Sequence, residues 1–235
     1  MRKLSRLLAA SVAGLSLAGM ASASHAAMVT IWIDDDGPGA HGFTQVGFDP
    51  LSTGTASFSG TIGGFVLNLG GSAGTWPVAN SQGIDTRSTG SGDLDIIVSV
   101  QGLTAPLGDR SWLSTFQTQP LSQGWTLTER TFLSASNQAL SGVLLASATM
   151  TANFLPQQAF SFAEAATGAG PYAINTEYVL HAAGAGSANS TISVFNNGII
   201  ERPGVPEPAT WGLMILGFGG VGSLLRQRRR QAALA

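Results

Sequence analysis

Between residues 27 and 195 the apolar positions form short runs that alternate with polar residues or continue for a few positions. Clusters of Gly, Ser, Thr, Asn and Pro separate these runs, and periodicity over a helix length is missing, which is typical of β-strands. The pattern predicts an all-β fold, a single antiparallel β-sandwich-like domain. The predicted strands cover residues 29–33, 64–69, 94–100, 125–133, 141–150, 159–162, 172–181 and 191–195.

Two parts of this pattern are ambiguous. The run 125–133 alternates, but Glu129 and Thr131 share one side with Trp125 and Leu127, so neither side is cleanly apolar. Residues 70–92 form a long polar stretch rich in Gly and Ser, which we interpret as a disordered excursion from the domain.

The amino-terminal residues have the pattern of a secretory signal peptide. Arg2, Lys3 and Arg6 precede an apolar run over 7–20, and small residues suited to signal peptidase follow. We assign residues 1–26 to this signal and expect an exported domain over 27–195, followed by a linker over 196–205.

The carboxy-terminal residues predict a marginal membrane span. Residues 211–225 carry no charge and would extend about 22 Å as a helix, short of a ~30 Å hydrocarbon core. Interfacial Trp211 and the snorkelling side chains of the following arginines can close part of this gap. Because cationic residues resist translocation, these arginines and the tail 231–235 are expected to stay cytoplasmic. The arginines are Arg226, Arg228, Arg229 and Arg230.

The order of features over residues 206–230 resembles the PEP-CTERM sorting signal, in the variant with a tryptophan after the second proline. The residues that carry this resemblance are Pro206, Glu207, Pro208 and Trp211, with Gly212 where alanine is usual, and then the arginine cluster. The resemblance implies recognition by an exosortase in the inner membrane of a Gram-negative bacterium that makes exopolysaccharide. It also implies cleavage near Pro206–Pro208 and delivery to the cell surface, outer membrane or extracellular matrix. The alternative is a permanent single-pass anchor.

Charge separates the exported part from its signals. Residues 27–205 contain twelve acidic and four basic residues, a net charge of −8, while the whole chain has −2. An acidic surface repels phosphate, so nucleic-acid binding is not expected. The chain has no cysteine, so thiol catalysis and thiolate metal sites are excluded.

The sequence contains two groups of aspartates, one directly after a predicted strand and the other at a predicted strand. Asp34, Asp35 and Asp36 form a cluster in which hard-cation ligands could gather, but the spacing does not match an EF-hand. We expect a solvated turn there, with calcium as the alternative, and we expect no cofactor. Asp93 and Asp95 stand two residues apart on a predicted strand and are expected to face solvent together.

Candidate ligand-binding or catalytic residues are few. Exposed aromatic rings could stack on sugars, and Trp76, beside Pro77 in the polar stretch, is the candidate among Trp32, Trp76, Trp112 and Trp125. The only histidines after residue 26 are His41 and His181, and no Gly-x-Ser-x-Gly elbow occurs. We therefore expect a protein that is not an enzyme, with a structural or adhesive role linked to exopolysaccharide. The alternative is an extracytoplasmic hydrolase or a calcium-dependent carbohydrate-binding protein.

Overall fold

The computed structural model describes residues 27–36 and 42–199. The predicted signal peptide, the sorting signal with the predicted span 211–225, and His41 lie outside these residues. Within them, no helix is long and apolar enough to cross a membrane.

All regular elements of the described residues are strands, as the apolar pattern predicts. They are β1 (Met28–Asp34), β2 (Thr44–Phe48), β3 (Thr55–Ile62), β4 (Phe65–Ala73), β5 (Ala79–Ser88), β6 (Gly92–Leu103), β7 (Asp109–Thr118), β8 (Thr126–Ser134), β9 (Val143–Thr151), β10 (Gln157–Ala166), β11 (Tyr172–Ala182) and β12 (Gly186–Ile199).

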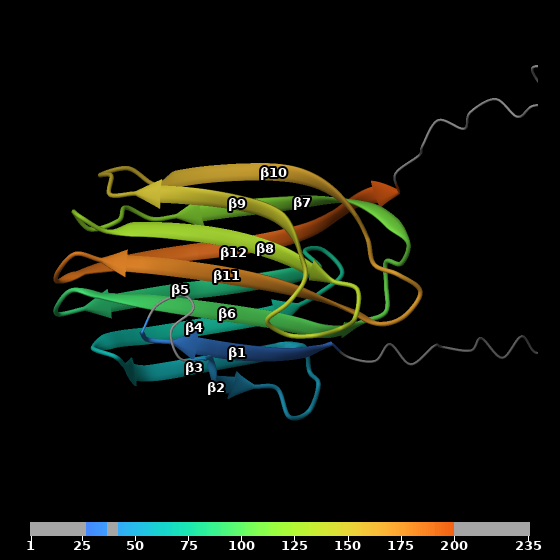
Figure 1. Cartoon of the computed structure of the whole chain (residues 1–235), viewed down its shortest axis with the longest axis horizontal. Helices are drawn as coiled ribbons and strands as arrows, with labels where there is room; N and C mark the ends of the chain where they lie inside the picture. Colours follow the sequence, from blue (N-terminus) through green and yellow to red (C-terminus); the bar gives the residue numbers. More distant parts are fainter. Residues whose placement is uncertain (1–26, 37–41, 200–235) are drawn as a thin grey trace, which may run out of the picture. The chain divides into compact units, whose positions relative to one another are not determined.

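The strands form two six-stranded sheets that face each other (Figure 1). Sheet A has the order β2-β1-β6-β11-β8-β9, and sheet B has the order β10-β7-β12-β5-β4-β3. The registers given by paired Cα atoms are antiparallel in both sheets. The predicted antiparallel sandwich is thereby confirmed.

Large apolar side chains fill the space between the sheets. Trp112, Trp125, Phe65 and Phe116 are each at most 1% exposed and belong to one continuous hydrophobic cluster. Burying a side chain of this kind contributes roughly 1.5–3 kcal/mol. With no disulfide available, this packing provides most of the stability of the domain.

Polar side chains also lie between the sheets, which explains the mixed pattern of residues 125–133. Glu129 and Thr131 on β8 are fully buried, and Ser114 on β7 bonds the Thr131 hydroxyl at 2.7 Å. Thr118 on β7 donates to Glu129 at 3.3 Å, and Ser190 on β12 bonds the other carboxyl oxygen. The inward row of β8 is therefore partly polar because hydroxyl groups of sheet B compensate it.

The structure corrects several predictions. The stretch 70–92 is not a disordered excursion, because it holds the end of β4 and all of β5. Strands β2, β3, β5 and β7 were not predicted from the pattern. β12 runs to Ile199, so it enters the segment 196–205 that the sequence assigned to a linker.

Candidate functional site

The outer face of sheet A brings aromatic and charged side chains from different strands into one row. The register pairs Trp32 on β1 with Ile97 on β6, Ile97 with Glu177 on β11, and Glu177 with Arg130 on β8. Arg130 donates from Nη1 to Glu177 Oε2 at 2.9 Å, and its side chain is 38% exposed against 13% for Glu177. Trp32 donates from its indole nitrogen to the Thr30 hydroxyl at 2.9 Å, which fixes the ring on this face.

A second row on the same face contains two buried carboxyl groups. Asp34 at the end of β1 pairs in register with Asp95 on β6, and they are 4% and 2% exposed. Asp95 Oδ1 has no hydrogen-bond partner. Burial, with the negative charges of Glu177 and Asp34, raises the pKa of Asp95 to about 7, while Arg130 opposes this shift. The expectation that Asp93 and Asp95 face solvent together is therefore wrong for Asp95.

A third row continues this buried polar surface. Ser99 on β6 pairs with Asn175 on β11, and both side chains are almost completely buried. Asn175 donates from Nδ2 to the carbonyl oxygens of Ser141 at 2.5 Å and Gln138 at 3.3 Å. Ser99 Oγ and Asn175 Oδ1 have no hydrogen-bond partner, so two further polar atoms on this face have unused capacity.

The β8–β9 loop, residues 135–142, closes one side of this surface and forms a pocket. At Gly142 the φ angle is +143° and an added Cβ would stand 2.6 Å from the carbonyl oxygen of Leu133, so the loop requires glycine there. The pocket has a volume of about 160 Å³. Its lining residues are Ile97, Phe132, Leu140, Ser141, Gly142, Asn175 and Glu177.

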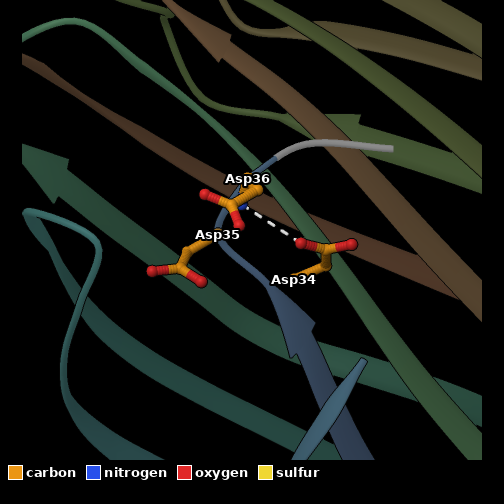
Figure 2. Close-up of side chains that lie close together, drawn as sticks. All are labelled: Asp34, Asp35 and Asp36. Atoms are coloured by element: carbon orange, nitrogen blue, oxygen red, sulfur yellow. Dashed lines mark hydrogen bonds between the residues drawn. The ribbon is translucent and has the colours of Figure 1, made fainter. Parts of the chain in front are cut away.

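The acidic turn after β1 lies beside the second row, and its side chains diverge (Figure 2). Asp36 donates its backbone N–H to Asp34 Oδ1 at 3.1 Å, and one oxygen of each of the three aspartates lies within 4.8 Å of the others. Figure 2 shows the Asp35 side chain pointing away from that of Asp34. Asp35 lies against the β3–β4 turn, where an added Cβ on Gly63 would stand 2.7 Å from its Cβ. Only Asp35 and Asp36 are exposed, so the cluster is not simply a solvated turn.

The other candidates lie elsewhere or outside the described residues. Trp76 is 62% exposed, and its ring lies 4.8 Å from that of Phe195, between centroids, on the side of sheet B. His181 on β11 contacts Asp93 Oδ1 through Nδ1 at 2.6 Å, and both side chains are exposed. Trp112 and Trp125 are core residues. Trp76 therefore does not line the pocket. The sorting residues lie outside the residues that the structure describes.

Sequence reasoning missed the residues that define this surface. Arg130, Glu177 and Asn175 look like ordinary polar positions of alternating strands. Their proximity depends on the pairing of β8 with β11, which no local pattern encodes. The isolated charges inside otherwise apolar runs were the available signal.

Comparison with family models settles the carboxy-terminal assignment. Residues 204–230 match the PEP-CTERM protein-sorting motif. The chain carries a PEP-CTERM sorting motif. This confirms the resemblance drawn from Pro206 to Arg230, and the PEP-CTERM motif implies export, surface sorting and exosortase processing.

Curated proteins give no match to the chain. Among solved structures, the chain is similar to TmCBM61 in complex with β-1,4-galactotriose (10% identity, TM-score 0.34, covering 51% of this chain and 72% of that one). It is also similar to a carbohydrate-binding module of Cellvibrio mixtus lichenase 5A in complex with cellotriose (14% identity, TM-score 0.28, covering 62% of this chain and 89% of that one). A third similar structure is the enzymatically active domain of a tailspike protein of bacteriophage CBA120 (13% identity, TM-score 0.28, covering 72% of this chain and 18% of that one). At this level of similarity, no ligand or activity carries over to the present chain.

Proposed function

We propose that this chain is an exported surface or matrix protein, processed by an exosortase, whose sandwich domain binds exopolysaccharide through the outer face of sheet A. Its role is then structural or adhesive. The observation that carries the binding part of the proposal is the pocket between the β8–β9 loop and the row that contains Arg130 and Glu177.

The chemistry of this face suits a saccharide. Sugars present hydroxyl groups that donate and accept hydrogen bonds, together with C–H faces that stack on aromatic rings. Arg130 supplies donors and Glu177 supplies acceptors in the same row as Trp32, which lies two strands from Glu177. Asn175, one of the residues that line the pocket, has a buried Oδ1 acceptor without a partner.

The size of the pocket limits what it can hold. A volume of about 160 Å³ is well below the roughly 300–1,000 Å³ of pockets for drug-sized ligands. We therefore assign the pocket to one sugar unit or a substituent of it. The rest of a polysaccharide chain would extend from the pocket toward the partly buried ring of Trp32.

Binding is favoured over hydrolysis by the burial of the carboxyl groups. A glycosidase needs two carboxyl groups with separated pKa values on either side of the scissile bond. On the outer face of sheet A, the pKa of Asp95 is raised to about 7, and Glu177 is paired with Arg130. Asp95 is only 2% exposed, however, so its proton is poorly placed to reach a substrate.

The test is co-sedimentation of the purified protein with exopolysaccharide from the producing cells. Trp32→Ala should weaken binding roughly two- to tenfold, the effect of losing an aromatic contact of ~0.5–1.5 kcal/mol. Trp76→Ala is the matched control, because it removes the same type of side chain from the β4–β5 connection, beside Phe195 of sheet B. Loss of binding in the Trp76→Ala variant alone would reject the sheet A face and support Trp76 instead. Undiminished binding in both variants would remove both aromatic candidates.

A further inference from the structure

We propose that Asp34 and Asp95, on the neighbouring strands β1 and β6, form a calcium site on the outer face of sheet A. This inference concerns a metal site and does not rest on polysaccharide binding. It differs from the solvated turn expected from the sequence because its central ligand comes from a distant strand.

The geometry begins with the register of the two strands. Directly opposed residues of an antiparallel pair have Cβ atoms roughly 4.5–5.5 Å apart and point to the same face. Asp34 and Asp95 are such a pair, so their carboxyl groups emerge side by side. The Asp36 backbone N–H donates a hydrogen bond to Asp34 Oδ1 at 3.1 Å.

The Asp95 carboxyl group is buried with one oxygen unsatisfied. Asp95 is 98% buried, and its Oδ1 has no partner although buried carboxyl oxygens normally accept hydrogen bonds. An unsatisfied buried oxygen beside a second carboxyl group is unfavourable unless a cation or a proton lies between them.

The charged side chains around the pair compensate its charge only in part, through Arg130. Glu177, on β11, adds a negative charge, and Arg130, on β8, already forms an ion pair with Glu177. One row away, Asp93 is paired with His181. Among the described residues, the electrostatic balance at Asp34 and Asp95 therefore calls for additional positive charge.

Calcium fits this set of ligands better than a softer or more demanding metal. All the donors are carboxylate oxygens, which excludes a preference for thiolate- or imidazole-binding ions. Calcium accepts irregular oxygen sets completed by water, whereas magnesium needs near-octahedral geometry. Sites of extracellular modules have Kd values of about 10⁻⁴–10⁻³ M, which matches a partly formed site of this kind.

The test compares thermal unfolding of the full chain, purified in detergent at about pH 8, in EDTA and with calcium or magnesium. With calcium at roughly a hundred times Kd, Tm should rise by about 5–10 °C, and less with magnesium. Asp95→Asn should abolish the calcium-dependent rise. Asp93→Asn, two residues away on the same strand and face, is the matched control and should retain it.

Equilibrium dialysis with radioactive calcium gives the stoichiometry independently of folding. One bound ion in the wild type and in Asp93→Asn, and none in Asp95→Asn, would support the site. If Asp95→Asn fails to fold, Asp34→Asn provides the same comparison. Absence of calcium binding by the wild type, or equal binding by Asp95→Asn and Asp93→Asn, would overturn the proposal. These results are obtained without polysaccharide, so they leave the proposed function to its own test.

Discussion

Glu129 places an ionisable carboxyl group in the middle of the sandwich. Its side chain is fully buried between Thr118 and Ser190, whose hydroxyls contact its two oxygens. Burial raises its pKa from 4.5 to about 7, against the opposing effect of these hydrogen bonds. Tyr178 pairs with Glu129 in register, and its hydroxyl forms hydrogen bonds with the Ser81 hydroxyl and the Ile192 backbone N–H. Glu129 is therefore part of a layer of polar side chains inside the core.

This shift predicts a stability that decreases as the pH rises. Between pH 4.5 and about 7 the folded chain keeps the Glu129 proton that the unfolded chain has lost, so stability falls through this window and levels off above it. Glu129→Gln removes this ionisation while keeping polar contacts. Between pH 5 and pH 8, the unfolding free energy of this variant should fall by about 1–3 kcal/mol less than that of the wild type.

Urea unfolding at the two pH values measures the effect. Exposed Glu164 on β10 provides the matched control, and Glu164→Gln should keep the full pH dependence. A residual slope in Glu129→Gln is expected from Asp95, whose pKa is also raised to about 7. Identical pH dependence in wild type and Glu129→Gln would show that Glu129 does not titrate in this range.

At the scale of elements, the two sheets approach each other closely at Gly71 on β4. An added Cβ there would lie 2.4 Å from Val98 Cγ1 on β6 and 3.0 Å from Val29 Cγ1 on β1. Both valines belong to the hydrophobic core of sheet A. A single methyl group at position 71 would therefore force the sheets apart or displace both side chains.

Gly71→Ala should lower the unfolding free energy by about 1–3 kcal/mol, as is usual when a packed core is overfilled. Gly90→Ala is the control, because an added Cβ at Gly90 meets no atom within 4 Å, and its effect should stay within about 0.5 kcal/mol. The urea midpoint of each variant provides the comparison. Equal midpoints for the two variants would contradict the close packing at β4.

The elements also show why only part of the fold could be predicted. Strands 94–100 and 172–181 are apolar enough to be recognised, and β6 and β11 contain them almost unchanged. β5 and β7 were missed because many of their inward positions carry hydroxyls, which resemble loop residues. Ser81 contacts Tyr178, and Ser114 contacts Thr131 across the core, so these polar positions are compensated by residues that hydropathy cannot reveal.

The candidate site was predictable only in fragments. The acidic turn at Asp34 and the exposure of Trp76 follow from local sequence, since both adjoin Gly- and Pro-containing segments. The pairing of Asp34 with Asp95, and of Arg130 with Glu177, depends on contacts between distant strands. Strand register, and not residue type, creates this surface.

At the scale of the whole molecule, charge is divided between the domain and its sorting segments. Residues 27–205 carry a net charge of −8, while seven of the eleven Lys and Arg residues lie in the first six positions and in the cluster ending at Arg230. Removing both ends would therefore release a strongly acidic protein. Such a surface would favour divalent cations over phosphate-rich partners.

Processing of the PEP-CTERM motif predicts a mature protein that ends near Pro206–Pro208 and lacks Trp211 and all later residues. Because proline disfavours the helical conformation of the residue before it, the sequence predicts an extended backbone here, which a processing enzyme can bind. Intact mass spectrometry of surface material should show this truncation, and isoelectric focusing should give a point below the value of 5.8 for the full chain. Replacing both prolines by alanine should leave Arg230 attached and the protein in the membrane fraction, whereas Glu201→Gln, in the preceding segment, should be processed normally. Wild-type protein that still carries Arg230 at steady state would instead identify the carboxy-terminal segment as a permanent anchor.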